Sequence, residues 1–170
     1  LAHVAMGADA ICFFQWRQSK SGAEAFHSAM LPHAGADSKV FRGVCELGKA
    51  LKTLSDAGLQ GTELERAGTA ILFSAESEWA TRSETLPSMK LNHWHDVRDW
   101  YRGFLDAGLR ADVVPLAYDW TGYKTIVLPT VLSLSDEDVL RIADFAKAGG
   151  TVIVGYAAGL IDEHFHIGLG

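Results

Sequence analysis

The sequence has few cysteines and no long apolar run, and each shortage excludes a class of protein. Cys12 and Cys45 are its two cysteines. They lack C-x-x-C spacing and stand in apolar stretches, so we interpret them as reduced core thiols rather than a disulfide or metal site. Reduced thiols favour a cytoplasmic location. No apolar run reaches the roughly 20 residues of a membrane helix, and the N-terminus lacks a signal-peptide pattern. We therefore expect neither a membrane partner nor export.

Positive charge is also scarce. The chain has 15 Lys and Arg against 21 Asp and Glu, which gives a formal net charge of -6. Binding to nucleic acid requires clustered Lys and Arg that neutralise phosphates, so we expect no nucleic-acid partner. Hydrophobic residues make up 48% of the chain and charged residues 21%. These fractions are typical of a folded globular protein and exclude a disordered chain.

The first 57 residues predict a helix, a strand, a long loop and a second helix. A helix end is closed by Gly7, and the continuous apolar run Ala8–Trp16 is typical of a parallel strand buried on both faces. Ser38 can cap a helix whose apolar stripe runs from Val40 to Leu54 at spacings of three and four. This order fits the last unit of a (β/α)8 barrel or a piece of an open sheet.

Residues 58–68 are polar, have glycine at 58, 61 and 68, and show no apolar period, so we interpret them as a linker. Beyond them, short β-branched runs alternate with helical patterns. This alternation predicts a small doubly wound α/β domain over residues 69–170, with a parallel sheet and crossover helices. The predicted strands are 69–74, 110–116, 124–130 and 151–156, and the predicted helices are 93–107 and one that begins after Ser135 and ends at Gly149.

This second domain shows no pattern for catalysis or cofactor binding. Its first strand leads into SAESEW, which has neither the G-x-G-x-x-G nor the Walker spacing, and Ser74 lacks the flanking glycines of a nucleophile elbow. Two H-x-H pairs, at 93 and 95 and at 164 and 166, lack the additional ligand spacing of a zinc site. We therefore expect no cofactor and no metal.

The stretch GAEAFHSAMLPHAG, residues 22–35, is a stronger candidate for a binding site. It follows the carboxyl end of the predicted strand 8–16, which is where a barrel builds its active site. If residues 22–30 make a helical turn, Glu24 and His27 lie on one side of it and can both bind a polyol. Trp16, at the strand end, can stack on a sugar ring. The alternative is a structural loop in which the carboxylate and imidazole have no ligand.

A family resemblance rests on longer segments. The stretch GADAICFFQWRQSKSGAEAFHSAMLPHAG resembles the end of the catalytic barrel in family 42 glycoside hydrolases, the bacterial β-galactosidases. The segments ILFSAESEWA, GYKTIVLPTVLSLSDE, AGGTVIVGY and GLIDEHFHIGLG are similar to the trimerisation domain of that family, a flavodoxin-like or amidotransferase-like module without the amidotransferase nucleophile. The resemblance covers essentially the whole chain. It implies the end of a TIM-barrel domain over 1–57 and a trimerisation domain, truncated at its C-terminus, over 69–170.

The resemblance also implies a function. Family members are retaining enzymes that hydrolyse terminal non-reducing β-D-galactosides and assemble as homotrimers. A Glu and a His of the last barrel loop contact the bound galactose, which assigns substrate binding to Glu24 and His27. Retention requires two carboxyls about 5 Å apart, and in the family both lie on earlier barrel strands. The expected catalytic residues are therefore absent from this chain, and so is the family's cysteine-bound zinc.

One alternative function remains open at this point. Residues 69–170 can act as a stand-alone flavodoxin-like module for ligand binding or assembly, without catalysis. The first 55 residues favour the β-galactosidase hypothesis instead, because a stand-alone module has no use for a barrel strand and a galactose-binding loop.

Overall fold

The computed structural model describes residues 1–84, 86 and 88–167. The chain divides into two compact units, unit 1 over Leu1–Glu65 and unit 2 over Arg66–Gly170. We keep 1–57, 58–68 and 69–170 as proposed domain limits, and residues 168–170 of the last range lie outside the described residues. Within the described part of the chain, no helix is both long and apolar enough to cross a membrane.

Unit 1 has helices at both ends of a long irregular segment. Helix α1, Ala2–Ala5, is followed by Gly7 at a φ of 95°, as expected for a helix end. The predicted strand 8–16 does not form a regular strand in this chain, and Phe14 and Trp16 on it are 72% and 61% exposed. A parallel strand is stabilised by hydrogen bonds to neighbours on both sides, and the backbone pairing near this run is a single bridge between Arg17 and Leu31.

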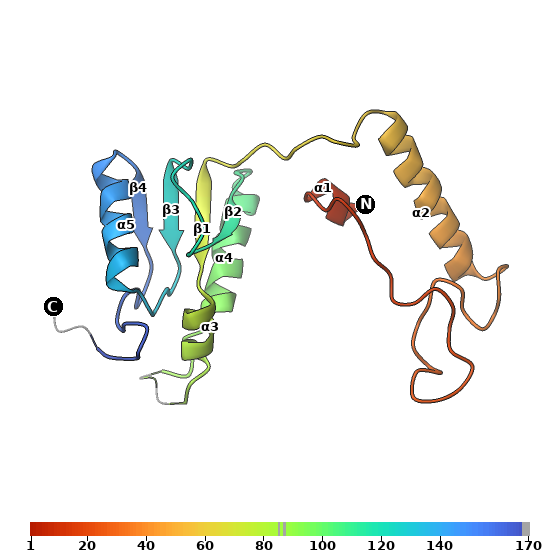
Figure 1. Ribbon diagram of the computed structural model, residues 1–170, viewed down its shortest axis with the longest axis horizontal. Coiled ribbons are helices and arrows are strands. Elements are labelled where there is room, and N and C mark those ends of the chain that lie inside the picture. The colour runs from red at the N-terminus through yellow and green to blue at the C-terminus, as the bar shows by residue number, and fades with distance from the viewer. Residues whose placement is uncertain (85, 87, 168–170) are drawn as a thin grey trace. The chain divides into compact units, whose positions relative to one another are not determined.

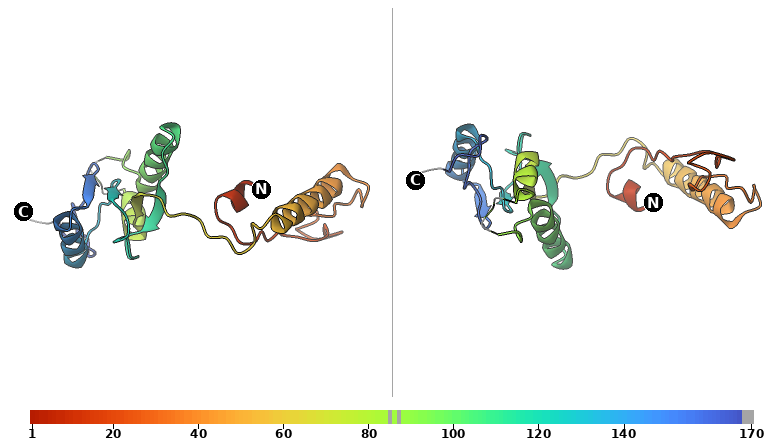
Figure 2. Two further views of the ribbon diagram at one scale, coloured as in Figure 1. Left: turned by 90° about the horizontal axis from the view of Figure 1, so that it is seen from above. Right: turned by 90° about the horizontal axis from the view of Figure 1, so that it is seen from below.

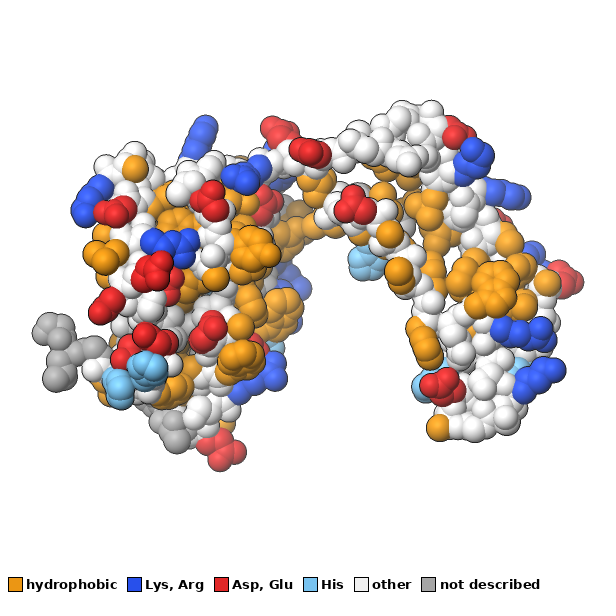
Figure 3. Space-filling model, in the orientation of Figure 1, with side chains coloured by type: hydrophobic (Ala, Val, Ile, Leu, Met, Phe, Trp, Pro, Cys, Tyr) orange, Lys and Arg blue, Asp and Glu red, His pale blue; other side chains and the backbone are white. Residues whose placement is uncertain are grey.

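Helix α2, Lys39–Asp56, confirms the second predicted helix. The Ser38 side chain accepts a hydrogen bond from the Phe41 N–H at 3.2 Å, which is the predicted N-cap. No residue of α2 is buried, because unit 1, which the structure describes in full, contains no sheet to cover its apolar stripe. The prediction of buried cysteines was wrong for the same reason, since Cys12 and Cys45 are both free and exposed. Hydrophobic side chains are accordingly visible on the surface (Figure 3).

Unit 2 contains a four-stranded parallel sheet, as predicted. Its strands are β1 (Thr69–Phe73), β2 (Asp112–Pro115), β3 (Thr125–Leu128) and β4 (Thr151–Val154), in the order β2-β1-β3-β4 (Figure 1). In register, Ile71 lies opposite Val113 on one side and Val127 on the other. This order is that of a flavodoxin-like sheet, and its direction of winding reverses between β1 and β3.

Helices cover both faces of the sheet (Figure 2). Helix α4, His93–Asp106, packs Val97 on Ile71 and Val127. Helix α5, Asp136–Lys147, packs Phe145 in the cluster on the opposite face. Successive strand residues alternate between the faces, so β1 and β3 are buried on both sides and read as continuous apolar runs. The cluster beneath α5 contains Ala70, Leu72, Val114, Leu116, Trp120, Ile126, Leu128, Val131 and Phe145.

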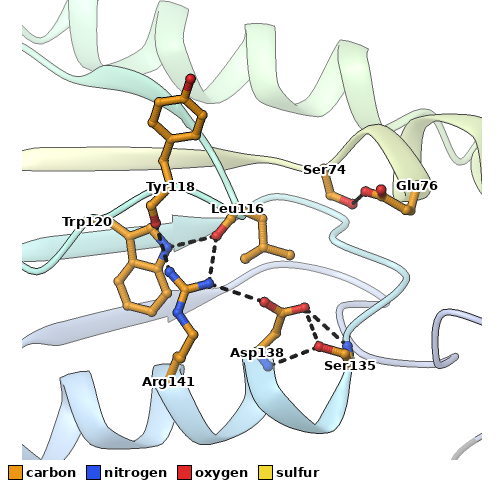
Figure 4. A network of polar contacts seen from close by, with 8 residues as sticks. All are labelled: Ser74, Glu76, Leu116, Tyr118, Trp120, Ser135, Asp138 and Arg141. Atoms are coloured by element: carbon orange, nitrogen blue, oxygen red, sulfur yellow. Dashed lines mark hydrogen bonds and ion pairs between the residues drawn. The ribbon is translucent and has the colours of Figure 1, made fainter.

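The connection from β2 to β3 has no helix and is held by Arg141 of α5. The guanidinium of Arg141 stacks on the ring of Trp120 at 4.7 Å and donates to the carbonyl oxygens of Leu116 at 3.1 Å and Tyr118 at 2.7 Å (Figure 4). Asp138 lies 3.5 Å from Arg141 and also completes the capping box with Ser135. The start of α5 and the β2–β3 connection are therefore joined by one polar network.

Candidate functional site

The loop that carries Glu24 and His27 has closed ends. The Met30 N–H donates to the Gln15 carbonyl at 2.9 Å, and the Leu31 N–H donates to the Trp16 carbonyl at 2.8 Å. The Leu31 carbonyl in turn accepts from the Gln18 N–H at 3.0 Å. These backbone bonds bring the two ends of the segment together, as in a compact surface loop. The residues between these bonds form a closed loop rather than an open linker.

Glu24 and His27 lie on one turn within this loop. The Ala25 N–H donates to the Gly22 carbonyl at 3.2 Å, and the His27 N–H donates to the Glu24 carbonyl at 3.0 Å. Gly22 has a φ of 79°, a conformation that glycine adopts without steric cost. The side chains of Glu24 and His27 are both exposed. The turn therefore brings the two residues together and leaves their side chains accessible to a ligand.

Trp16 lies at the base of the same loop. Trp16 is 61% exposed, and its ring makes a T-shaped contact with Phe41 of α2, with ring centroids 6.2 Å apart. This contact places the indole between the end of the expected strand and the helix that follows the loop. A tryptophan with this much exposed surface can contact a flat apolar ligand surface, such as one face of a sugar ring.

Two further residues shape the loop from inside, and no motif in the sequence singled them out. The Gln18 side-chain N–H donates to the Ala25 carbonyl at 3.2 Å, and its side-chain oxygen accepts from the His33 N–H at 2.9 Å. The His33 Nε2 atom lies 3.1 Å from the same Ala25 carbonyl. The sequence signal for these bonds is weak, because they join residues seven, eight and fifteen positions apart in a segment without periodicity.

The second place to look for chemistry is the carboxyl edge of the sheet in unit 2, where β1 and β3 diverge. His93 fills this position and is 0% exposed. Its Nδ1–H donates to the Pro129 carbonyl, just after β3, at 2.7 Å, and its Nε2 accepts from the Ser74 N–H, just after β1, at 2.9 Å. Both ring nitrogens are used in neutral imidazole. His93 is therefore a structural bridge between two strand ends and is not available as a metal ligand.

The hydroxyl groups beside His93 are also engaged. The Ser74 hydroxyl accepts from the Ser77 N–H at 3.0 Å and caps helix α3, Ala75–Thr81. Thr130, at a φ of 41°, donates its hydroxyl hydrogen bond to Asp96. A serine nucleophile needs its oxygen, rather than its backbone N–H, bonded to the histidine base. In this arrangement Ser74 caps α3 and His93 joins the ends of β1 and β3.

His93 makes the stability of unit 2 dependent on pH. Burial lowers the pKa of His93 below its ordinary value of 6.5, and this outweighs the Pro129 carbonyl and the charges of Glu78 and Asp96, which raise it. The folded state therefore binds fewer protons than the unfolded state between the lowered pKa and 6.5. We expect the free energy of unfolding to fall as the pH drops below about 6.5, by at most about 1.4 kcal/mol per pH unit from this group.

Urea unfolding at pH 7.5, 6.0 and 5.0 measures this dependence, with His93→Gln as the test variant. His93→Gln is expected to be less stable at pH 7.5 but to lose less stability on acidification. His95→Gln changes the exposed histidine two positions along α4 and is expected to keep the parent's pH dependence. Identical slopes for the parent and His93→Gln would contradict the assignment.

The second H-x-H pair belongs to a surface turn. The Asp162 carboxylate accepts from the backbone N–H groups of His164 and His166, both at 2.8 Å, and lies 3.0 Å from the His166 Nδ1 atom. These bonds lower the pKa of Asp162, the largest contribution coming from the His166 N–H. Over the described residues, no group of three or more His, Cys, Asp or Glu side chains has a metal-binding arrangement.

Comparison with known proteins gives one family match in each unit. A family model described as beta-galactosidase matches residues 1–54, and one described as beta-galactosidase trimerisation domain matches residues 67–170. Beta-galactosidase BbgII from Bifidobacterium bifidum is 52% identical over 170 residues, which is 100% of this chain and 25% of that protein. The chain thus spans about a quarter of the length of the curated relatives that it matches.

Solved structures of β-galactosidases are also similar to this chain. The crystal structure of a β-galactosidase from Bifidobacterium adolescentis is 78% identical, with a TM-score of 0.61, over 62% of this chain and 48% of that chain. A catalytic mutant of Gan42B, a GH42 β-galactosidase from G. stearothermophilus, is 35% identical over 98% of this chain and 24% of that chain, with a TM-score of 0.89.

Unit 2 is therefore an α/β domain of the trimerisation type, with a flavodoxin-like strand order. The chain as a whole belongs to the family 42 β-galactosidases, and it matches a fragment of them that includes the trimerisation domain.

Proposed function

We propose that this chain is a segment of a retaining β-galactosidase that hydrolyses terminal non-reducing β-D-galactosides. The observation that carries the proposal is the order of the two family matches, with the catalytic family over residues 1–54 and the trimerisation family over 67–170. A stand-alone α/β module would match only the second. The alternative of a non-catalytic ligand-binding or assembly module therefore has less support.

Within that enzyme, we propose that Glu24, His27 and Trp16 bind the galactose unit. The exposed carboxylate of Glu24 can accept hydrogen bonds from two neighbouring sugar hydroxyls, and His27 on the same turn can donate or accept one more. Trp16 can cover the apolar face of the ring. These are binding groups, and the general acid and the nucleophile belong to the part of the catalytic domain that precedes residue 1.

We further propose that unit 2 supplies the contact surface of a homotrimer and that the enzyme is cytoplasmic. The description of the family model for residues 67–170 supports the trimer. The side chains of Leu105, Leu109 and Val113 are 62%, 58% and 45% exposed on α4, the turn after it and the edge strand β2. Apolar exposure of this kind is common at subunit interfaces. Two free cysteines are compatible with a reducing compartment.

The test is expression of the full-length protein that contains this chain. We expect it to hydrolyse 4-nitrophenyl β-D-galactoside with retention, which NMR shows as initial release of β-galactose, and to sediment as a trimer in analytical ultracentrifugation. 4-Nitrophenyl β-D-glucoside, which differs at one hydroxyl, serves as the matched control substrate. Failure to cleave the galactoside, or an initial α-galactose product, would reject the proposed activity, and a monomer would reject the proposed assembly.

A further inference from the structure

One side chain makes two hydrogen bonds within the loop around Glu24 and His27. Gln18 reaches across the loop and satisfies a backbone carbonyl at Ala25 and a backbone N–H at His33. Its amide thus uses a donor at one end and an acceptor at the other. The primary amide of glutamine offers both groups in one plane, and the two backbone partners determine which way the amide points.

The acceptor that Gln18 engages is the carbonyl between the two proposed sugar-binding residues. Ala25 follows Glu24 and precedes His27 by two positions, so the orientation of its peptide group affects the direction of both side chains. His33 Nε2 contacts the same carbonyl at 3.1 Å, and both of its lone pairs are thereby occupied. The neighbouring Phe26 is 94% exposed, so little side-chain packing restrains this part of the loop.

The Gln18 bonds do more than close the loop. Its ends are already joined by backbone bonds from Met30, Leu31 and Gln18. The side chain of Gln18 adds a link from this closure to the tip of the loop, where Glu24 and His27 lie. A loop with closed ends and a free tip samples many conformations, and binding must then order it at an entropic cost.

We propose that Gln18 is a positioning residue for substrate binding: by fixing the Ala25 peptide, it pre-organises Glu24 and His27 for the sugar. Gln18 touches no substrate itself. This inference rests on the proposed function of the loop. It adds a residue that lowers the entropic cost of ordering Glu24 and His27 when the sugar binds. His33 acts in the same direction through its own contact with Ala25.

Gln18→Glu tests the inference with almost no change in size. The carboxylate still accepts from the His33 N–H, but it places an oxygen against the Ala25 carbonyl where a donor was. In the full-length protein we expect KM for the galactoside to rise roughly tenfold with a smaller change in kcat, and the Kd for galactose measured by calorimetry to rise by a similar factor. Gln60→Glu is the matched control, because the exposed Gln60 accepts a hydrogen bond from the Ser55 hydroxyl, which a carboxylate also accepts.

A double-variant cycle separates positioning from general structural support. If Gln18 acts through the loop tip, Gln18→Glu should weaken galactose binding by a smaller factor in the His27→Ala variant than in the parent, because Glu24 is then the one sugar-binding residue of the tip that is left to position. Multiplying effects would mean that Gln18 acts independently of His27 and would overturn the inference. If Gln18→Glu does not fold, judged by its melting temperature, Gln18→Met removes both bonds without adding charge and decides the question by the same comparison.

Failure of this inference differs from failure of the proposed function. If the parent cleaves galactosides and Glu24→Gln weakens binding, but both Gln18 variants behave like Gln60→Glu, only the positioning role is rejected. If the parent neither binds galactose nor cleaves galactosides, the proposed function and the positioning role that depends on it are both rejected.

Discussion

The 170-residue chain by itself is expected to leave 4-nitrophenyl β-D-galactoside uncleaved, at a rate no higher than that of a buffer blank. Retaining hydrolysis needs an acid/base carboxyl and a nucleophilic carboxyl about 5 Å apart. The family resemblance assigns both to barrel strands outside this segment and leaves Glu24 as a binding group. Without the pair, the rate falls by the whole catalytic enhancement, at least about a millionfold.

The measurement is release of nitrophenol by the purified chain over several days, with the full-length protein as the positive control. A second sample of the chain, in which Glu24 is replaced by Gln, shows whether any residual signal comes from the chain or from a contaminating host enzyme. Turnover that survives repeated purification and disappears in Glu24→Gln would show that this segment holds catalytic residues.

Replacing Glu24 by Gln or His27 by Ala in the full-length enzyme is expected to lower kcat/KM for the galactoside by about 30- to 1,000-fold. This corresponds to a loss of about 2 to 4 kcal/mol of transition-state stabilisation. In the proposed roles, each change leaves a bound sugar hydroxyl without its hydrogen-bond partner. For Glu24 the lost bonds are also charge-assisted, so its effect should be the larger of the two.

Steady-state kinetics with the parent and both variants provide the measurement. Glu46→Gln removes an exposed carboxylate from α2, and His95→Ala removes an exposed imidazole from α4. Both control variants should match the parent. If Glu24→Gln and His27→Ala also match it within about twofold, the loop has a structural role and the sugar must be bound elsewhere.

Unit 2 was largely predictable from its sequence, because its signals are local and agree with one another. The apolar runs of β1 and β3 are buried on both faces, and Ser135 and Asp138 form the capping box that their spacing predicts. Helix α3 was missed, since its seven residues are too few to show a helical period. Only the N-cap Ser74 and the acids after it marked the start of this helix.

Unit 1 shows the opposite case. The run from Ala8 to Trp16 predicts a buried strand, but in this chain no regular strand forms there, and the backbone bonds to it come from the loop residues Met30 and Leu31 at its end. A strand needs neighbouring strands along its whole length. The exposure of Cys12 and Cys45 has the same origin. A local pattern records the environment in which a segment is normally buried, and it persists in the sequence when that environment is not part of the chain.

The sequence by itself determined the family, the alternation of strands and helices in unit 2, and the short motif that contains Glu24 and His27. The tertiary structure decided which groups are free to act. It showed that both nitrogens of His93 are used to join the ends of β1 and β3, and that Gln18 reaches the Ala25 carbonyl. Hydrogen bonds between distant residues depend on the path of the backbone in three dimensions, which spacing along the chain does not specify.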